Sequence, residues 1–415
     1  MTSNGSLPQD VFAGIRIADF AWVGVGPLVS KYLADHGAEV IRIESSVRPE
    51  PLRRAPPFVN DQPGIDNSGY YADFNSSKLC CSLNLQHPDG VALAKRIVAE
   101  CDIVTESFTP KAMRAWGMTY DDLREVRSDV IMISMPMYGS TGPWSMWQGY
   151  GHVLQAAAGI SHLTHYPGEE PIGTGVAYTD FLVPHFAAIA LIAALDHRER
   201  TGEGQNIDFG QLEAAIHATE SMILDYTVNG REQDALGTRH LDHAPHGAYR
   251  CAARGDEDDD RWIAIVCTSD EEWQSLAKIA DHPEWASDPR FAAASDRLKH
   301  QDDLDALIAN WTRSQSAEAL MQSLQQAGVP AGVVQTPEDL RNDPQLDHRG
   351  HFWMLDHPTM GHRAYDGPSF RLSETPATLT KSAPLLGEDN EYVYKQIVGM
   401  SDEEYIEHLI SGALD

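Results

Sequence analysis

From about residue 14 to about residue 145, the chain alternates between short runs of apolar and β-branched residues and longer segments with helical spacing. The first unit reads as a strand at 15–22, a helix at 26–37 that ends at a glycine, and a second strand at 39–44. Strands that alternate with helices in this way favour parallel strands joined by crossover helices. The pattern therefore predicts an open α/β sheet, a Rossmann-like large domain.

Beyond about residue 150 the pattern becomes strongly helical, and the segment from Asp180 to about Arg200 is apolar over most of its length. A second set of strands and helices begins near residue 231, where Ser269 and Glu272 have the spacing of a capping box. We therefore expect a large domain that is interrupted by a smaller α+β domain. The expected parts are 1–230 (first part of the large domain), 231–335 (small domain) and 336–415 (return to the large domain).

The composition narrows the class of protein. The 415 residues include 31 Lys and Arg against 61 Asp and Glu, a net charge of −30. An acidic chain without a basic run is a poor match for a phosphate backbone or an anionic membrane surface. No stretch looks long and apolar enough to span a membrane, and the start lacks the pattern of a signal peptide. We expect a soluble cytoplasmic protein with no nucleic-acid and no membrane partner.

One motif suggests a dinucleotide cofactor, but residues within it argue against that interpretation. Gly24 and Gly26 follow the first strand, and Glu44 ends the next, as in part of a dinucleotide fingerprint. Val29 occupies the place of the third glycine, and Pro27 lacks an amide donor, so a tight turn into a helix is the favoured interpretation.

Three histidines, His240, His243 and His246, are spaced by three residues and could serve a metal on a helix. Pro245 and the nearby glycines indicate a loop instead, and no Cys or Glu completes a ligand set. We expect no metal site.

Asp180 follows a glycine-rich turn and directly precedes the long apolar helix, which is where an N-cap residue belongs. One interpretation is a helix cap without chemistry. The other is a nucleophile, because a carboxylate at a helix N-terminus is held ionised by the amide dipoles and can attack a carbonyl. The pattern alone leaves both open.

Several segments, in order along nearly the whole chain, match a known family. They are GIRIADF (14–20), Gly26-Pro27, LADHGAEVIRIE (33–44), NSSK (75–78), 102–117, 134–143, RTGEGQ (200–205), GVPAG (328–332) and APLLGE (383–388). Together they resemble the class III CoA-transferases, which include formyl-CoA, carnitine and benzylsuccinate CoA-transferases, with α-methylacyl-CoA racemase as a relative.

The resemblance implies two interlaced, ring-like chains that form a homodimer with the active site between subunits. It also implies that Asp180 matches the catalytic aspartate, which attacks an acyl-CoA and forms a mixed anhydride that an acceptor acid resolves. The substrates would be an acyl-CoA donor, for which succinyl-CoA is one candidate, and a free carboxylic acid as the acceptor. No permanently bound cofactor is implied, because the coenzyme A thioester is itself a substrate.

The resemblance also assigns binding residues. The candidates for the CoA phosphates are Arg42, Lys78 and Arg114, with Arg53 and Arg54 as weaker ones. The candidates for substrate contacts are Trp22, Tyr150, His152, Gln155 and Gly247, the last in a glycine-bearing loop that resembles the family's mobile loop.

His152 leaves the reaction open at this stage. It lies where the racemase relative carries a histidine base, so His152 and Asp180 could exchange the α-proton of a 2-methylacyl-CoA. The match of Tyr150 to a tyrosine of formyl-CoA transferase favours the transferase. A third possibility is a subunit that works only in a heteromer with a paralogue, and the presence of Asp180 argues against a noncatalytic subunit.

Overall fold

The computed structural model describes residues 10–255, 260–379 and 381–415, and its contacts separate into two compact units. The first unit contains the described residues up to Ile160 together with Gly173–Gly230 and Pro344–Asp415. The second contains Ser161–Ile172 and Arg231–Asp343. The short segment 161–172 was not assigned to the small part by the sequence, and the division into domains at 231–335 stays a prediction.

The first unit is built on a six-stranded sheet in which every neighbouring pair is parallel. The strand order is β3-β2-β1-β4-β5-β6, the order of doubly wound dinucleotide-binding folds. The predicted open parallel α/β sheet is therefore confirmed. The strands are β1 Arg16–Asp19, β2 Glu39–Glu44, β3 Leu79–Ser82, β4 Ile103–Glu106, β5 Ile131–Ser134 and β6 Asn206–Asp208.

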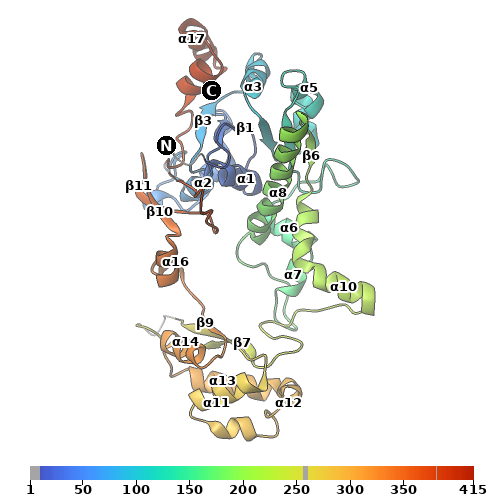
Figure 1. Cartoon of the computed structure of the whole chain (residues 1–415), viewed down its shortest axis with the longest axis vertical. Helices are drawn as coiled ribbons and strands as arrows, with labels where there is room; N and C mark the ends of the chain where they lie inside the picture. The colour runs from blue at the N-terminus through green and yellow to red at the C-terminus, as the bar shows by residue number, and fades with distance from the viewer. Residues whose placement is uncertain (1–9, 256–259, 380) are drawn as a thin grey trace, which may run out of the picture. The chain divides into compact units, whose positions relative to one another are not determined.

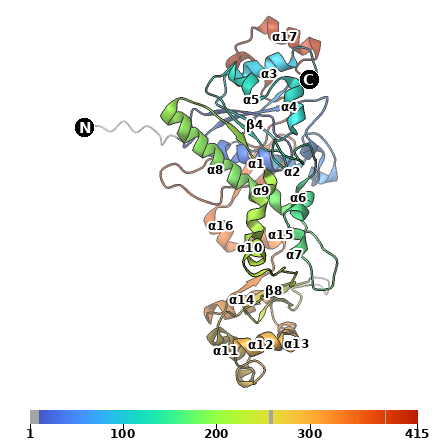
Figure 2. The same ribbon diagram turned by 90° about the vertical axis from the view of Figure 1, so that its right-hand side faces the viewer.

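Two apolar layers cover the two faces of this sheet, because successive side chains of a strand point to opposite faces. Ile17 and Val40 belong to one layer, and Ala18 and Ile41 belong to the other. Helices α1 and α8 lie side by side over the first face, as Figures 1 and 2 show, whereas α3 and the C-terminal α17 supply the second layer. The C-terminal helix α17 therefore packs in the same hydrophobic core as strands β1 and β2.

The remaining elements of the first unit connect and flank the sheet. Its helices are α1 Val25–Ala34, η1 Pro51–Arg54, η2 Val59–Asp61, α2 Gly69–Phe74, α3 Gly90–Ala99, α4 Pro110–Trp116, α5 Tyr120–Arg124, α6 Gly151–Ala157, α8 Tyr178–Thr201, α9 Gln211–Ile216, η3 His217–Thr219, α10 Glu220–Asn229, α16 Pro344–Arg349, η5 Tyr392–Ile397 and α17 Asp402–Ser411. A short helix, α7 Ile160–Leu163, crosses the boundary between the units. A separate antiparallel hairpin joins β10 Phe352–His357 to β11 Gly361–Asp366.

Helix α8 corrects two expectations. It begins at Tyr178 with Ala177 at the N-cap, so Asp180 lies in the first turn and does not cap the helix. Its 24 residues have a mean hydropathy of 1.6 in their most apolar window, which is enough by length and composition to cross a membrane. The expectation that no stretch reaches this length was therefore wrong, although a core helix passes the same test.

The second unit has a three-stranded antiparallel sheet with helices packed around Trp273. Ser269 accepts a hydrogen bond from the amide of Glu272, which confirms the predicted helix start. Its strands are β7 His246–Arg250, β8 Trp262–Val266 and β9 Ala331–Val333, and its helices are α11 Asp270–Ile279, η4 Pro283–Ser287, α12 Ala294–Lys299, α13 Gln301–Thr312, α14 Ala317–Gln326 and α15 Pro337–Arg341.

Candidate active site

A cavity of about 490 Å³ lies in the first unit, and its lining includes residues that follow β1 and β4. The strand order reverses direction between these two strands, and open α/β sheets bind ligands outside the carboxyl ends of strands at such a point. The residues that line the cavity include Trp22, Gly24, Arg48, Ser107, Tyr150 and Asp180. The topology thus brings two predicted substrate residues, Trp22 and Tyr150, to the same cavity as Asp180.

The carboxylate of Asp180 is enclosed by two glycines from different elements. A Cβ atom built on Gly24, before α1, would lie 2.5 Å from Oδ2 of Asp180. A Cβ atom built on Gly151, at the start of α6, would lie 2.5 Å from Oδ1. No side chain larger than that of glycine fits at either position without displacing the carboxylate. The backbone therefore approaches both carboxylate oxygens closely while Asp180 still faces the cavity.

Burial changes the chemistry of Asp180. Desolvation raises the pKa of its carboxyl from 3.8 to about 6, and nearby His152 opposes this rise. The sequence suggested that amide dipoles at the helix N-terminus hold this group ionised; in the structure the largest influence on its pKa is burial, which raises the pKa. A carboxylate that is poorly solvated is a stronger nucleophile once ionised, and it remains mostly ionised at neutral pH.

Aromatic side chains and one arginine line the region beside Trp22. Trp22 packs edge to face on Phe108 with ring centroids 5.3 Å apart, and Phe108 packs in the same way on Trp116 at 5.4 Å. The guanidinium of Arg48 lies 5.5 Å from the centroid of the Trp22 ring. Arg48 is exposed, and the described residues give it no ion-pair partner. Sequence reasoning missed Arg48 because the loop after β2 contains several arginines that are indistinguishable by pattern.

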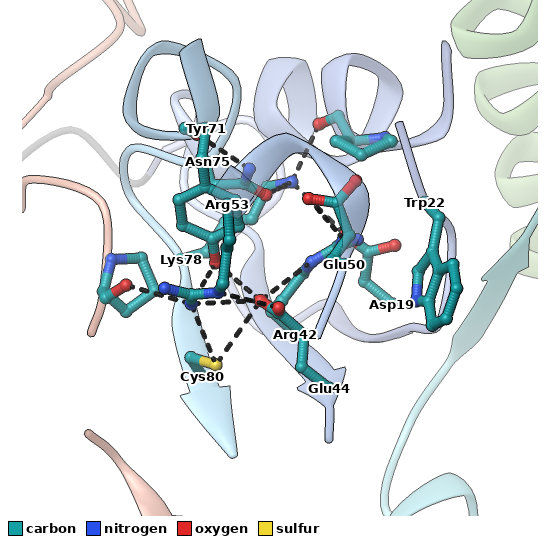
Figure 3. Close-up of polar contacts among 12 residues, drawn as sticks. Asp19, Trp22, Arg42, Glu44, Glu50, Arg53, Tyr71, Asn75, Lys78 and Cys80 are labelled. Carbon is teal, nitrogen blue, oxygen red and sulfur yellow. Dashed lines mark hydrogen bonds and ion pairs between the residues drawn. The ribbon is translucent and has the colours of Figure 1, made fainter. Parts of the chain in front are cut away.

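Arg42, predicted to bind CoA phosphates, lies on β2 opposite Asp19, is fully buried and is not among the residues that line the cavity. Figure 3 shows it among buried polar side chains. Its guanidinium is surrounded by three carboxylates: Asp19 at 3.4 Å, Glu44 at 3.5 Å and Glu50 at 4.0 Å. Its charge is already compensated inside the protein. The structure therefore does not bring Arg42 to where a ligand could reach it.

Lys78 and Arg53 are held in the same way. The Lys78 ammonium is buried and donates to Asp19 at 3.2 Å, and burial lowers its pKa to about 8. Arg53 forms an ion pair with Glu44 at 2.8 Å and lies over the ring of Tyr71. Glu44, the acidic residue of the partial dinucleotide fingerprint, is thus engaged by Arg53 and is not free for a ribose.

The other predicted contacts are dispersed. Arg114 is exposed on α4 and donates to the carbonyl of Pro110, 3.0 Å away. Gln155 is buried, and its amide nitrogen donates to the carbonyl of Val176 at 2.6 Å, so it braces the loop before α8. Gly247 lies in the second unit on strand β7, opposite Ile265, and not in a loop. His152 is exposed on α6 and does not line the cavity.

The three histidines of 240–246 do not form a metal site among the described residues. Instead the rings of His240 and His243 stack with centroids 4.7 Å apart, and His246 Nδ1 lies 2.6 Å from the carbonyl oxygen of Thr238. A different group in the second unit has metal-ligating atoms within 4.8 Å of one another: His162, His165 and Asp234.

The fold and the site define an α/β enzyme class in which a buried carboxylate faces a cavity at the topological switch point of a parallel sheet. The sequence model of CoA-transferase family III matches residues 12–390, and the chain belongs to this family. It is a CoA-transferase of family III, and acyl-CoA substrates follow from that membership.

Named relatives and a solved structure agree with this assignment. The chain is 31% identical to succinyl-CoA–D-citramalate CoA-transferase of Chloroflexus aurantiacus, with 94% of each chain covered. It is 28% identical to human succinyl-CoA:glutarate CoA-transferase, with 97% of this chain and 89% of the relative covered. A CAIB/BAIF family protein from Brucella suis has a TM-score of 0.84 at 28% identity, covering 94% of this chain and 100% of that one.

Proposed function

We propose that this enzyme moves CoA from succinyl-CoA to a small dicarboxylic acid through an anhydride at Asp180. The observation that carries the proposal is the Asp180 carboxylate, which is enclosed by Gly24 and Gly151 and faces a cavity at the switch point. The names of the relatives, which pair succinyl-CoA with citramalate or glutarate, support the donor and the class of acceptor.

The reaction balances without a cofactor. An oxygen of Asp180 attacks the thioester carbonyl, the carbon–sulfur bond breaks, and CoA leaves as a thiolate, so that a succinyl-aspartyl anhydride remains. The acceptor carboxylate then attacks the aspartyl carbonyl and releases succinate. The retained thiolate attacks the acceptor's carbonyl in the new anhydride, which forms the product thioester and restores the Asp180 carboxylate.

The surroundings of Asp180 suit this chemistry. Ionisation near pH 6 leaves the carboxylate available at neutral pH, and its burial limits access of water to an anhydride that water would hydrolyse. The exposed Arg48 beside Trp22 is our candidate for an anionic part of a substrate, in place of Arg42 and Lys78, which are buried and paired.

Racemisation of a 2-methylacyl-CoA remains the second candidate, because His152 is near enough to lower the pKa of Asp180. It predicts that deuterium from solvent enters the α-position of the thioester without any acceptor acid. The transferase predicts no such exchange and an absolute requirement for the acid.

We also propose that the active form is a dimer of interlaced chains in the cytoplasm. Exposed apolar side chains on α8 and α10 support a protein partner for these helices. They are Ile189, Ile192, Leu224, Tyr226 and Val228. A heteromer with a paralogue is the alternative, since the L-malate CoA-transferase of Chloroflexus aurantiacus has alpha and beta subunits, each about 30% identical to this chain. Light scattering and an activity assay of the purified chain distinguish the two. A dimer that is active without any other protein supports the homodimer, whereas an inactive chain supports the heteromer.

The experiment that tests the proposed reaction is chemical trapping. Enzyme incubated with succinyl-CoA and then hydroxylamine should carry a hydroxamate on Asp180, detected by mass spectrometry of its peptide. The Asp180→Ala variant provides the control. Full transferase activity in that variant would disprove the mechanism.

A further inference from the structure

The loop between β1 and α1 contains Ala21–Gly24; Trp22, Val23 and Gly24 line the cavity, and Gly24 lies against Asp180. Gly24 leaves no room for a side chain beside Oδ2 of Asp180, so a shift of this loop changes where the carboxylate can lie. Val23, directly before Gly24, has a φ of 65°, a left-handed conformation that β-branched residues strongly disfavour. A loop with such a residue keeps its shape only if surrounding groups hold it.

Three side chains from other elements hold the backbone of this loop. The amide of Trp22 donates to Ser107 Oγ at 2.9 Å, and Ser107 Oγ donates back to the Trp22 carbonyl at 3.1 Å. Arg42 donates to the carbonyl of Ala21. The amide of Val23, the strained residue itself, donates to Glu50 Oε1 at 2.7 Å.

Glu50 has no evident role in contacting substrate. It is fully buried, and the cavity is lined by its neighbours Arg48 and Pro51 but not by Glu50 itself. Its second oxygen, Oε2, faces the Arg42 guanidinium 4.0 Å away (Figure 3). The same arginine thus supports Glu50 and holds the Ala21 carbonyl, so that both ends of the loop depend on one buried ion pair.

We propose that Glu50 is a positioning residue for the transfer reaction: through its hydrogen bond to Val23 it holds Gly24 against the carboxylate of Asp180. This inference rests on the proposed function of Asp180. It predicts that Glu50 affects the step in which Asp180 attacks the thioester, although Glu50 does not touch the substrate.

Two conservative variants of Glu50 separate its hydrogen bond to the Val23 amide from its negative charge beside Arg42. Glu50→Gln keeps a carbonyl oxygen at the right distance for the Val23 amide but loses the negative charge beside Arg42. Glu50→Asp keeps the charge but shortens the side chain by one methylene group, so its carboxylate no longer reaches the amide. If position matters, the aspartate variant loses more activity than the glutamine variant; if only compensation of Arg42 matters, the order is reversed.

The measurement is the rate of hydroxylamine trapping at Asp180 with saturating succinyl-CoA, together with kcat and KM. We expect Glu50→Asp to lower kcat and the trapping rate about 100-fold, Glu50→Gln less than about tenfold, and KM for succinyl-CoA to change less than about threefold in both. A matched control is Asp66→Asn, which removes the ion pair of 2.6 Å between the partly exposed Asp66 and the buried Arg53, away from the loop. It should lower the melting temperature and leave kcat unchanged.

The outcomes distinguish this inference from the reaction on which it depends. Absence of any Asp180 adduct in the wild-type enzyme would overturn the proposed reaction itself. A normal wild-type adduct, with Glu50→Asp trapping at the wild-type rate or Glu50→Gln slower than Glu50→Asp, would overturn the positioning role alone. A lower melting temperature without a slower trapping rate would reduce Glu50 to a stabilising residue.

Discussion

Two groups of charged residues lie near the carboxyl ends of β1 and β2, and they differ in whether their charges have partners. In the buried cluster every ionised side chain faces an opposite charge, as Arg42 does with Asp19 and Glu44. In the cavity, Asp180 and Arg48 have no ion-pair partner among the described residues. A charge that is already paired inside the protein supports structure, whereas a charge left without a partner is available for a reaction or a ligand.

The largest effect on activity should follow from replacing the cavity's unpartnered carboxylate. Asp180→Asn should lower kcat by about 1,000-fold or more, because the proposed nucleophile is lost. Stability should not fall. The folded protein holds the Asp180 proton more tightly than the unfolded chain, since the pKa is raised from 3.8 to about 6, so ionisation costs stability as pH rises through that window. A thermal melt at pH 7 should give an equal or higher midpoint.

Replacing the buried, paired Arg42 should instead lower the free energy of unfolding. Arg42→Met leaves Glu50 without a cation among the described residues, while Asp19 keeps Lys78 and Glu44 keeps Arg53. Breaking a buried ion pair costs about 3–5 kcal/mol. Denaturant unfolding should report a loss of that size. The same measurement on Arg48→Met should show almost none, and equal losses in both variants would remove the distinction between the two groups of charges.

The two glycines beside Asp180 test how closely the cavity is built around its carboxylate. Gly24→Ala or Gly151→Ala should lower kcat about 100-fold, because the new methyl group displaces the carboxylate oxygens. At Gly24 the new methyl group meets Asp180 alone among its nearest described neighbours, so this variant should fold. At Gly151 it would also lie 2.5 Å from Cβ of Ala177, which cannot move without its backbone, so the melting temperature of that variant is measured beside its kcat. Trapping with hydroxylamine should slow in parallel, and Gly332→Ala, where a Cβ meets no described atom within 4 Å, serves as the control.

The pH dependence of the reaction should reflect the raised pKa of Asp180. Because the protonated carboxyl is not a nucleophile, kcat/KM should fall about tenfold per pH unit below the pKa of about 6. An acid limb near pH 4 would instead mean that the carboxylate is solvated as in a surface residue. Melting curves at each pH exclude unfolding as the cause.

The smallest effect concerns the exposed cation of the cavity. Arg48→Ala should raise KM for succinyl-CoA about fivefold to tenfold while kcat and the melting temperature hardly change, because an exposed arginine contributes to binding of an anion but to no internal pair. Arg114→Ala, which removes an exposed arginine outside the cavity lining, is the matched control. A larger KM effect from Arg114→Ala would restore the sequence-based assignment.

Much of the local structure could be predicted from the chain alone. The alternation of strands and helices up to residue 145 and the helix start at Ser269 depend on neighbours in sequence, and both are present. The start of α8 was misplaced because helix boundaries depend on packing as well as on capping. Family membership was also readable, since its motifs extend along nearly the whole chain.

The sequence by itself determined the parallel sheet and the family and made Asp180 a candidate for catalysis, because periodicity, turns and motifs are properties of neighbouring residues. Only the tertiary structure decided which charges are buried and paired, such as Arg42 and Lys78, and which face the cavity, such as Arg48. It also brought Gly24 and Gly151 against Asp180 from separate elements. Desolvation and close contact arise from residues distant in the chain, and no pattern of neighbours encodes them.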